Sequence, residues 1–377
     1  MPAVLILTSE FYGSANRIGS HEIANKLARL GYTTYIVSFP ITPLYRLFPK
    51  RTQYGDRSEF NCKFKQVDKN LYSYIPEVLI PPLPSLVKKL PCYLNRWEST
   101  CSNLNKQLSN KHFDFIFCES LFFPNSINNI SYSKLIVRLP DNLAGFWKNN
   151  TALHSAEHVL LKKADLIVSP SKKKLDDLAK LFSKEKLFFL PNGVNYDDYQ
   201  VPTPRPLEYD DYEHNAIYVG AIQKWFDLET LEQVAKQKKN WQFIIIGNSQ
   251  QKSTLPNVKF VGEKTGKEKI KYLQHADVGL IPFETKRNRA LIDYVNPIKL
   301  FEYLAAGIPV ISSSWSEILR IDAPITLANN VAEWVDTLSE LETSSQNQVH
   351  LKSFAKNFSW NAITQLLLDT IRDEKKN

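Results

Sequence analysis

Short apolar runs alternate with helix-like segments along most of the chain. Residues 21–31 have the spacing of an amphipathic helix closed by Gly31. We expect buried strands at residues 3–8, 33–39, 113–120, 134–139, 164–171 and 186–194. Strands that alternate with helices are typical of βα units and a parallel sheet, so the first half of the chain is predicted to form one doubly wound α/β domain.

The pattern breaks at Val201–His214, where three prolines and a cluster of acidic residues are typical of a linker. A second series then begins, with expected strands at residues 215–222, 241–248, 258–263 and 278–283 and helices near 228–237 and 268–275. We therefore predict two Rossmann-like domains, residues 1–201 and 202–358, whose strands end at a shared cleft.

The last segment, residues 359–377, is predicted to be a helix capped by Ser359. Its apolar stripe would consist of Ile363, Leu366, Leu367 and Ile371. Two interpretations remain open: an ordinary closing helix, or a helix that crosses back to the first domain.

Composition agrees with two folded cores, since 43% of the 377 residues are hydrophobic and 23% are charged. The formal net charge of +8 favours anionic partners, which include nucleotide phosphates, nucleic acid and acidic lipid headgroups. The basic residues are dispersed and no nucleic-acid-binding module is recognisable, so we expect no nucleic-acid partner.

The amino terminus MPAVLILTSEFYG lacks the basic region of a signal peptide, and no apolar run reaches the roughly 18 residues of a spanning helix. The four cysteines, Cys62, Cys92, Cys101 and Cys118, form no CxxC pair, which indicates reduced thiols and a cytoplasmic location. The adjacent aspartates fall in turns or in the expected linker, so no metal or other cofactor is expected.

The segment NPIKLFEYLAAGIPVIS, residues 296–312, predicts a short helix followed by a buried strand. Asn296 would be the cap, Pro297 the first helical residue, and Gly307 the end of the helix. Lys299 would then lie in the first turn, where the partial positive charge of the helix terminus disfavours a cation.

Two interpretations explain this lysine. Glu302 lies one turn away and could pair with Lys299, which stabilises a helix by about 0.2–0.5 kcal/mol. Alternatively, Lys299 and the free N–H groups could bind a diphosphate while Glu302 accepts hydrogen bonds from ribose hydroxyls.

The same segment closely resembles the donor-nucleotide motif of GT-B glycosyltransferases of the group 1 family. Further stretches resemble other parts of these enzymes, namely LPNGVNYDDY, ADLIVSPS, AIYVGAIQKWFD and FSWNAI. The resemblance implies that Lys299 binds the donor diphosphate and Glu302 the ribose, that Asn296 and Pro297 set the helix start, and that Gly220 lets the backbone approach the phosphates.

The resemblance departs from the retaining members, in which a second glutamate would occupy the position of Tyr294. KLIVRLPDNLAGFW instead resembles the xanthan glucuronosyltransferase-like, inverting group, and implies that Asp141 is the catalytic base. Ordinary turn chemistry beside Pro140 is the other interpretation of this aspartate.

Three further residues follow from the GT-B resemblance. Arg17 and His21 lie in or after the loop that would face the acceptor, although His21 could simply lie on the surface of a helix. Arg289 follows a donor-domain strand and either contacts phosphate or belongs to a solvated charge run.

Residues 79–97, LIPPLPSLVKKLPCYLNRW, combine bulky apolar side chains with basic ones, which favours contact with an anionic membrane surface over a buried loop contact. We therefore expect a transferase that moves a sugar from a nucleotide-sugar donor, with UDP the expected nucleotide, to a glycan or lipid-linked acceptor in polysaccharide or cell-envelope synthesis. Inversion without metal is the preferred mechanism. The alternatives are a retaining enzyme with the same donor site and a non-catalytic sugar-nucleotide or polyanion-binding protein.

Overall fold

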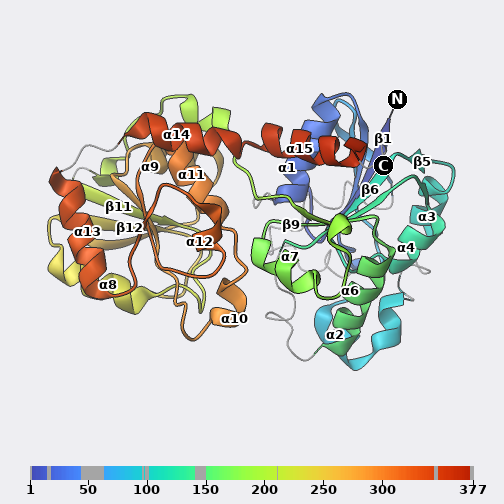
Figure 1. The fold of residues 1–377 in the computed structure, drawn as a ribbon, viewed down its shortest axis with the longest axis horizontal. Coiled ribbons are helices and arrows are strands. Elements are labelled where there is room, and N and C mark those ends of the chain that lie inside the picture. Colours follow the sequence, from blue (N-terminus) through green and yellow to red (C-terminus); the bar gives the residue numbers. More distant parts are fainter. Residues whose placement is uncertain are drawn as a thin grey trace. The chain divides into compact units, whose positions relative to one another are not determined.

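The computed structural model describes residues 2–14, 18–43, 63–95, 97, 102–140, 150–209, 211–343 and 347–373. The backbone divides into two compact units (Figure 1). Unit 1 comprises Met1–Pro170 and Lys174–Leu190, and unit 2 comprises Ser171–Lys173 and Pro191–Asn377. The division at Leu190 precedes the expected linker at Val201.

Unit 1 is built on an eight-stranded sheet in the order β10-β9-β8-β6-β1-β2-β4-β3. Its strands are β1 Ala3–Leu7, β2 Thr33–Val37, β3 Lys65–Asp68, β4 Leu71–Tyr74, β6 Phe115–Cys118, β8 Leu135–Arg138, β9 Leu166–Ser169 and β10 Leu187–Phe189. Every pairing is parallel except that of β3 with β4. All six strands expected in this half are confirmed, and β3 and β4 are additions.

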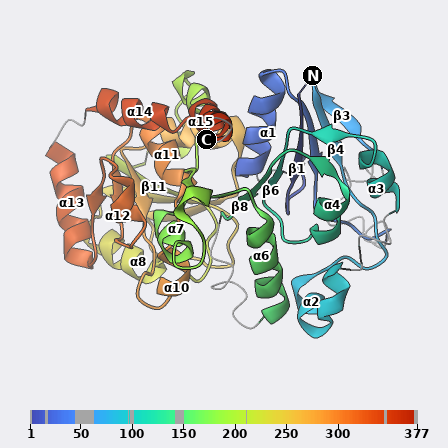
Figure 2. The same cartoon turned by 45° about the vertical axis from the view of Figure 1, so that its right-hand side comes forward.

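The first half also contains several helices and a separate two-stranded sheet of β5 and β7. They are α1 Gly19–Arg29, α2 Pro84–Lys89, η3 Pro91–Asn95, α3 Ser102–Leu108, β5 His112–Phe113, α4 Pro124–Asn129, β7 Ser131–Tyr132, α6 Thr151–Lys163, α7 Lys172–Leu178 and η5 Lys184–Lys186. Figure 2 shows α1 on one face of the sheet and α3 and α4 on the other. Strand side chains such as Leu5 and Leu7 pack with α3 and α4 in one apolar core.

Unit 2 has a six-stranded, fully parallel sheet in the order β13-β12-β11-β14-β15-β16. Its strands are β11 His214–Val219, β12 Trp241–Ile246, β13 Val258–Gly262, β14 Val278–Ile281, β15 Val310–Ser312 and β16 Thr326–Leu327. The unit starts at the central strand β11 and continues through β12 to the edge strand β13. It then crosses back to β14 on the other side of β11. This is the doubly wound order in which ligands bind where the winding reverses, here between β11 and β14.

Unit 2 contains ten helical segments among its described residues, several of which cover the two faces of its sheet. They are η6 Tyr196–Gln200, η7 Leu207–Tyr209, α8 Leu228–Gln237, α9 Gly266–Gln274, α10 Arg289–Ile292, α11 Ile298–Ala306, α12 Ile318–Ile321, α13 Val331–Thr343, α14 Gln348–Asn357 and α15 Trp360–Asp373. Figure 1 shows α9, α11 and α14 on one face, with α8 and α13 on the other. The two expected helices near 228–237 and 268–275 are confirmed.

The expected linker does interrupt the strand–helix alternation, but part of it is packed. Tyr209 is fully buried, and its hydroxyl donates to the Tyr272 carbonyl of α9 at 2.9 Å. The Thr203 hydroxyl lies 2.6 Å from Gln274 Oε1 of the same helix. The prolines and acidic residues correctly indicated a break in the strand–helix alternation. They carry no information on whether an aromatic ring in the same segment is buried.

The capping of α15 by Ser359 is confirmed, since its Oγ accepts from the Ala362 N–H at 3.3 Å. Ile363, Leu367 and Ile371 are buried as expected, whereas Leu366 is 39% exposed and does not belong to the buried stripe. Just before the helix, Ser359 forms a parallel bridge with Val194. A Cβ on Gly193 would lie 2.8 Å from the Trp360 ring, so this backbone contact requires glycine.

Candidate functional site

The helix that carries Lys299 begins one residue later than expected. Pro297 has extended dihedral angles and precedes α11, whose first residue is Ile298. Asn296 does not cap the helix, because its Oδ1 accepts from the Asn192 N–H at 3.4 Å. The Asn192 side chain in turn donates to the Asn296 carbonyl at 2.7 Å. A distant loop, rather than a local cap, therefore holds the start of α11.

The carboxyl end of α11 lies at Gly307, as the sequence predicts. Gly307 adopts a left-handed conformation with φ of +82°, and its N–H and that of Ile308 return to carbonyls in the last turn. The helix therefore places Lys299 in its first turn and Glu302 one turn further on.

Lys299 lies where the winding of the unit 2 sheet reverses. Its Nζ is 3.9 Å from the centre of the Tyr218 ring in β11 and 5.0 Å from that of Phe283, two residues beyond β14. Both rings present their faces to the ammonium group, an arrangement that stabilises a cation by about 0.5–2 kcal/mol. The first-turn lysine thus reaches the point at which doubly wound sheets bind ligands.

Gly220 lies directly beneath this ammonium group. It follows β11 with φ of +141°, and a Cβ at this position would lie 2.7 Å from Lys299 Nζ. Gly247, which follows β12, packs still more closely, since its Cβ would lie 2.1 Å from the Gly220 carbonyl oxygen. Two glycines after β11 and β12 therefore allow Lys299 and the two backbone segments to pack closely together.

Lys299 has no counter-ion within the part of the chain that the structure describes. Burial lowers its pKa to about 7, and the negative charge of Glu302 opposes part of this shift. A half-buried ammonium group without an anionic partner is costly, and an external anion at this position would restore its charge.

Glu302 pairs with a different lysine. Its Oε1 accepts from Lys269 Nζ of α9 at 2.5 Å, and the side chain is 13% exposed. Glu302 also accepts a hydrogen bond from Tyr199; burial and this carboxylate raise the Tyr199 pKa well above its usual value. The local pair between Lys299 and Glu302, one of the two interpretations of the sequence, is therefore not formed.

Tyr303 fixes the position of α11 against the sheet. Its hydroxyl accepts from the Val219 N–H at 2.9 Å and donates to the Leu280 carbonyl at 3.3 Å. Gly279 in β14 makes room for the ring, since a Cβ there would lie 2.4 Å from it. One tyrosine thus joins the helix to the two strands between which the winding reverses.

Two family models match the chain, one in each half. The model described as "Glucuronosyltransferase GumK, N-terminal domain" matches residues 6–170, and "Glycosyl transferases group 1" matches residues 213–344. The chain is a glycosyltransferase with the GT-B fold. The expected fold of two parallel-sheet α/β domains is confirmed.

Individual relatives agree with this glycosyltransferase assignment. The "Putative teichuronic acid biosynthesis glycosyltransferase TuaH" of Bacillus subtilis (strain 168) is 27% identical over 186 residues, which are 46% of each protein. The chain thus matches less than half the length of this relative. Sucrose-phosphate synthase from Thermosynechococcus elongatus superposes with a TM-score of 0.69 at 14% identity, and each chain is fully covered.

A second solved structure, Anabaena Alr3699/HepE in complex with UDP and glucose, also has a TM-score of 0.69. It is 12% identical, and the superposition covers 99% of this glycosyltransferase and all of the other chain. At such identities the two structures show the fold alone.

Among the described residues, no contact joins Arg289 to Lys299. Its side chain is 76% exposed, and its Nε donates to Asp293, the residue directly after α10, at 3.1 Å. Although burial raises the pKa of Asp293, hydrogen bonds from Ser316 and Arg289 lower it overall. A role for Arg289 toward the donor stays a prediction.

The acceptor-side residues belong to the first half of the glycosyltransferase. Asp141 and Arg17 lie outside the described residues. His21 is fully buried near the start of α1, so the interpretation that it lies on the helix surface is wrong. Its Nδ1 accepts from the Ile18 N–H at 3.5 Å, and its Nε2 lies 3.2 Å from the Glu10 carbonyl, which fastens the loop before α1 to the helix.

A buried ion pair lies close to the expected position of the base. Arg138 at the end of β8 pairs with Glu119 just after β6, and both side chains are almost completely buried. Because these strands are neighbours in the sheet, the pair joins their carboxyl ends directly before the segment that contains Asp141.

Proposed function

We propose that this glycosyltransferase moves a sugar from a UDP-sugar to a hydroxyl of a glycan or lipid-linked acceptor in polysaccharide or cell-envelope synthesis. The observation that carries the donor half is Lys299, a half-buried ammonium group with no counter-ion among the described residues, at the point where the unit 2 sheet reverses its winding. Two names among the relatives support the remainder: one structure contains UDP and glucose, and TuaH is named for teichuronic acid synthesis.

In this proposal Lys299 contacts the diphosphate of the donor. Its charge, together with the free N–H groups at the start of α11, would stabilise the negative charge that develops as the nucleotide leaves. Gly220 and Gly247 let the backbone approach the phosphates, and Glu302 accepts hydrogen bonds from the ribose hydroxyls. Since Glu302 is already paired with Lys269, ribose binding shares or replaces that contact.

We further propose an inverting, metal-independent transfer with Asp141 as base. The carboxylate takes the proton of the acceptor hydroxyl, whose oxygen forms a bond to the anomeric carbon while the bond to the diphosphate breaks. UDP leaves from the opposite face, so the configuration at the anomeric carbon is inverted. The reaction would take place in the cytoplasm, at the inner face of the membrane when the acceptor is lipid-linked.

Calorimetric titration with UDP, GDP and ADP at fixed salt tests the donor site. We expect selective UDP binding that weakens by at least about tenfold, or 1.4 kcal/mol, in Lys299→Ala. Lys236→Ala removes an exposed lysine from α8 and should bind UDP as the wild type does. Equal affinity of the wild type and Lys299→Ala would refute the donor site.

Product analysis tests the chemistry separately. Asp141→Asn should keep UDP affinity and lose transfer, and NMR of the product should show an inverted anomeric centre. A product with the donor's own configuration would instead establish a retaining enzyme with the same donor site.

A further inference from the structure

Lys299 has a candidate counter-ion on its own helix, and yet the two side chains do not pair. Glu302 follows Lys299 by three residues in α11, so both side chains lie on one side of the helix. A half-buried ammonium group is stabilised by a carboxylate at this spacing. The absence of the pair therefore needs a structural cause.

The cause is a second lysine on the neighbouring helix. Lys269 is the fourth residue of α9, which lies beside α11 on one face of the unit 2 sheet (Figure 1). Its Nζ donates to Glu302 Oε1 at 2.5 Å, and the two side chains are 23% and 13% exposed. Tyr199 of η6 donates a further hydrogen bond to the same carboxylate. Two donors from other elements therefore engage Glu302.

Buried tyrosines surround this arrangement. Tyr218 of β11 contacts the Lys299 ammonium group with its ring, and Tyr303 of α11 bonds to the backbone of β11 and β14. Burial raises the pKa values of Tyr199, Tyr218 and Tyr303 above that of an exposed tyrosine, so all three are neutral at pH 7. Asp198 is exposed, and its charge acts on Tyr199. Among the described residues, the charges at the centre of this arrangement are therefore those of two lysines and one glutamate.

The balance of these charges explains why Lys299 is unpaired. Lys269 neutralises Glu302, which leaves the ammonium group of Lys299 as the uncompensated charge. Without Lys269, the same carboxylate would attract Lys299, one turn away on the helix, and would neutralise it instead. A diphosphate would then have to displace Glu302 before it could bind the lysine.

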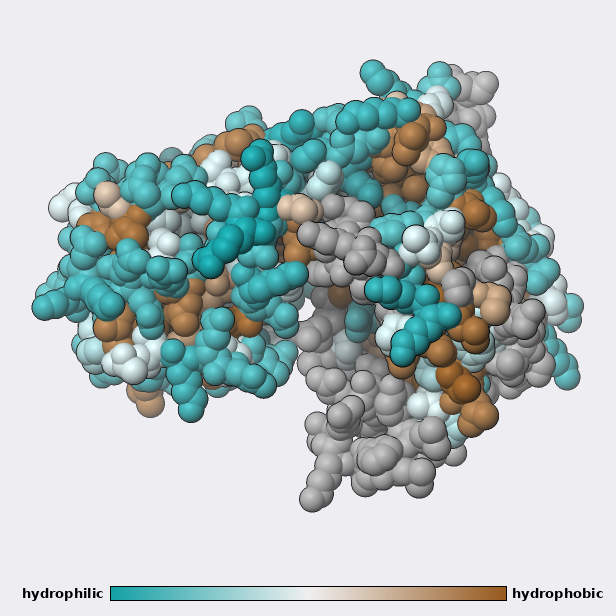
Figure 3. All heavy atoms as spheres, turned by 90° about the horizontal axis from the view of Figure 1, so that it is seen from below, coloured by the Kyte–Doolittle hydropathy of each residue, from teal (hydrophilic) through white to brown (hydrophobic). Residues whose placement is uncertain are grey.

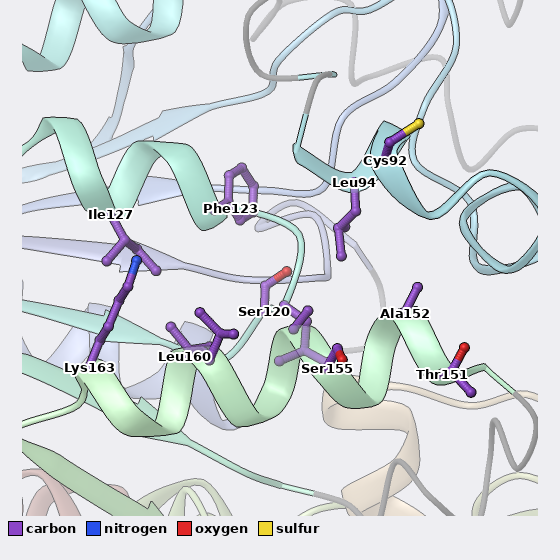
Figure 4. A pocket seen from close by; sticks show the side chains of 13 residues that line it. Cys92, Leu94, Ser120, Phe123, Ile127, Thr151, Ala152, Ser155, Leu160 and Lys163 are labelled. Atoms are coloured by element: carbon purple, nitrogen blue, oxygen red, sulfur yellow. The ribbon is translucent and has the colours of Figure 1, made fainter.

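Exposed lysines elsewhere in the chain lack this arrangement. A groove of about 440 Å³ in unit 1 follows α6 (Figure 4), and its lysine, Lys163, is exposed and donates to the Asn128 side chain. Figure 3 shows one face of the molecule, on which hydrophilic residues cover much of the surface. Water and salt screen exposed charges of this kind, so they attract an anion much less than a half-buried charge does.

We propose that Lys269 is a positioning residue of the donor site, which binds Glu302 and thereby keeps Lys299 unpaired for a diphosphate. The inference rests on the proposed function, because it takes the donor diphosphate as the anion that Lys299 binds. It also specifies how ribose binds, since Glu302 must accept from the ribose hydroxyls while Lys269 stays in place. A carboxylate can accept about four hydrogen bonds, which is sufficient for both contacts.

Titration of Lys299 in the ligand-free, full-length protein tests the first step. Heteronuclear NMR of labelled lysine side chains would follow its pKa, with the Lys299 signal assigned by its absence from Lys299→Arg. Lys269→Met should raise this pKa from about 7 to about 8 or higher, because Glu302 then acts on Lys299 without a competing ammonium group. Lys267→Met, which removes an exposed lysine from the same helix, should leave the pKa of Lys299 at about 7.

Inorganic pyrophosphate tests the second step, since it presents a diphosphate without a ribose. Calorimetric titration at about pH 6, where Lys299 of the wild type is mostly protonated, should show that Lys269→Met binds pyrophosphate at least about tenfold more weakly. Lys269→Arg keeps the ion pair and should stay within about twofold of the wild type, as should Lys267→Met. Glu302→Gln combined with Lys269→Met removes the competing carboxylate and should recover the affinity to within about threefold.

Two results would overturn the inference. One is an unchanged Lys299 pKa in Lys269→Met, and the other is a pyrophosphate affinity that Glu302→Gln does not recover. The second result would show that Lys269 contacts the phosphates itself or only supports the fold. If Lys269→Met does not fold by circular dichroism, Lys269→Gln removes the charge and keeps a hydrogen-bond donor, and the same results are expected from it.

The outcomes also separate this inference from the donor assignment. Binding of UDP and pyrophosphate that weakens in Lys299→Ala and not in Lys269→Met refutes only the role of Lys269. Absence of UDP and pyrophosphate binding in the wild type refutes the donor site, and with it the purpose that we assign to the pairing, whatever the Lys299 titration shows.

Discussion

Lys299 combines three properties that are rarely found together at one residue. It is half-buried, it lies against two aromatic faces, and it has no carboxylate partner among the described residues. Its neighbour Glu302, by contrast, is already paired with Lys269. A diphosphate can therefore bind this cation without first breaking a salt bridge.

Because the pKa of Lys299 is about 7 in the free protein, UDP binding should depend on pH. The diphosphate favours the protonated amine, so binding raises this pKa and takes up a proton above pH 7. We expect the ratio of Lys299→Ala to wild-type Kd to be constant below about pH 6. The ratio should fall above pH 7, by up to about tenfold per pH unit.

Ionisation of UDP itself affects the Kd values of both proteins equally, so it cancels in the ratio of these Kd values. Calorimetry between pH 5.5 and 9 in buffers of different ionisation enthalpy would also count the proton taken up. A ratio that does not change with pH would show that Lys299 keeps its charge throughout.

Gly220→Ala should weaken UDP binding at least about tenfold. The added Cβ would lie 2.7 Å from Lys299 Nζ at a backbone angle that favours glycine, so the lysine would be displaced. Gly262→Ala is the matched control, since its φ is +76° but nothing lies within 4 Å of the added atom. Both variants should lose about 1 kcal/mol of stability from backbone strain, and similar UDP affinities in the two would contradict the proposed contact.

At the residue scale, the sequence predicts Lys299, Glu302 and Gly220 as donor-site residues and gives no sign of the residues that surround them. The unusual first-turn lysine and the glycine after a strand are local signals. Lys269 and Tyr199 contact Glu302 from segments 33 and 103 positions away, and no local pattern indicates such pairings. Gly279 inside a strand was a signal for the close approach of Tyr303 that could have been used.

Among the elements, α11 depends on a tyrosine bridge rather than on its own cap. Tyr303→Phe leaves the Val219 N–H without its partner, which should lower the free energy of unfolding by about 1–3 kcal/mol. It should also weaken UDP binding several-fold, because α11 carries Lys299. Urea denaturation and UDP titration measure the two effects.

Tyr209→Phe gives the matched comparison, since that hydroxyl is also buried but bonds to α9. It should lose comparable stability and keep the wild-type UDP affinity. If both variants affected UDP binding equally, the bridge would have no specific role in placing α11.

The strands were more predictable than the helix starts and the loops. Fully buried parallel strands are continuous apolar runs, and eight of the ten strand ranges predicted before residue 284 are at least half covered by buried residues. β3 was missed because Lys65–Asp68 is a mostly exposed edge strand, and β4 because Leu71–Tyr74 mixes aromatic and polar residues. The start of α11 was misplaced by one residue because Asn192, a distant residue, replaces the local cap.

For the whole molecule, a ligand that contacts unit 2 alone should stabilise that unit selectively. At a UDP concentration about 100 times Kd the stabilisation is about 2.7 kcal/mol, which corresponds to a Tm increase of about 5–10 °C for a unit of this size. Scanning calorimetry should show one transition that shifts with UDP and one that does not. Lys299→Ala should remove the shift, and an equal shift of both transitions would contradict a donor site confined to unit 2.

The bridge between Val194 and Ser359 sets an order for biosynthesis. Val194 follows the last strand of unit 1 closely in the sequence, yet its partner lies 165 residues further along the chain. The residues of unit 1 are therefore all synthesised well before this bridge can form, while the segment after β10 must wait for Ser359. A chain that terminates before Trp360 would lack the ring that packs on Gly193. The first residues of unit 2 would then lose this packing contact.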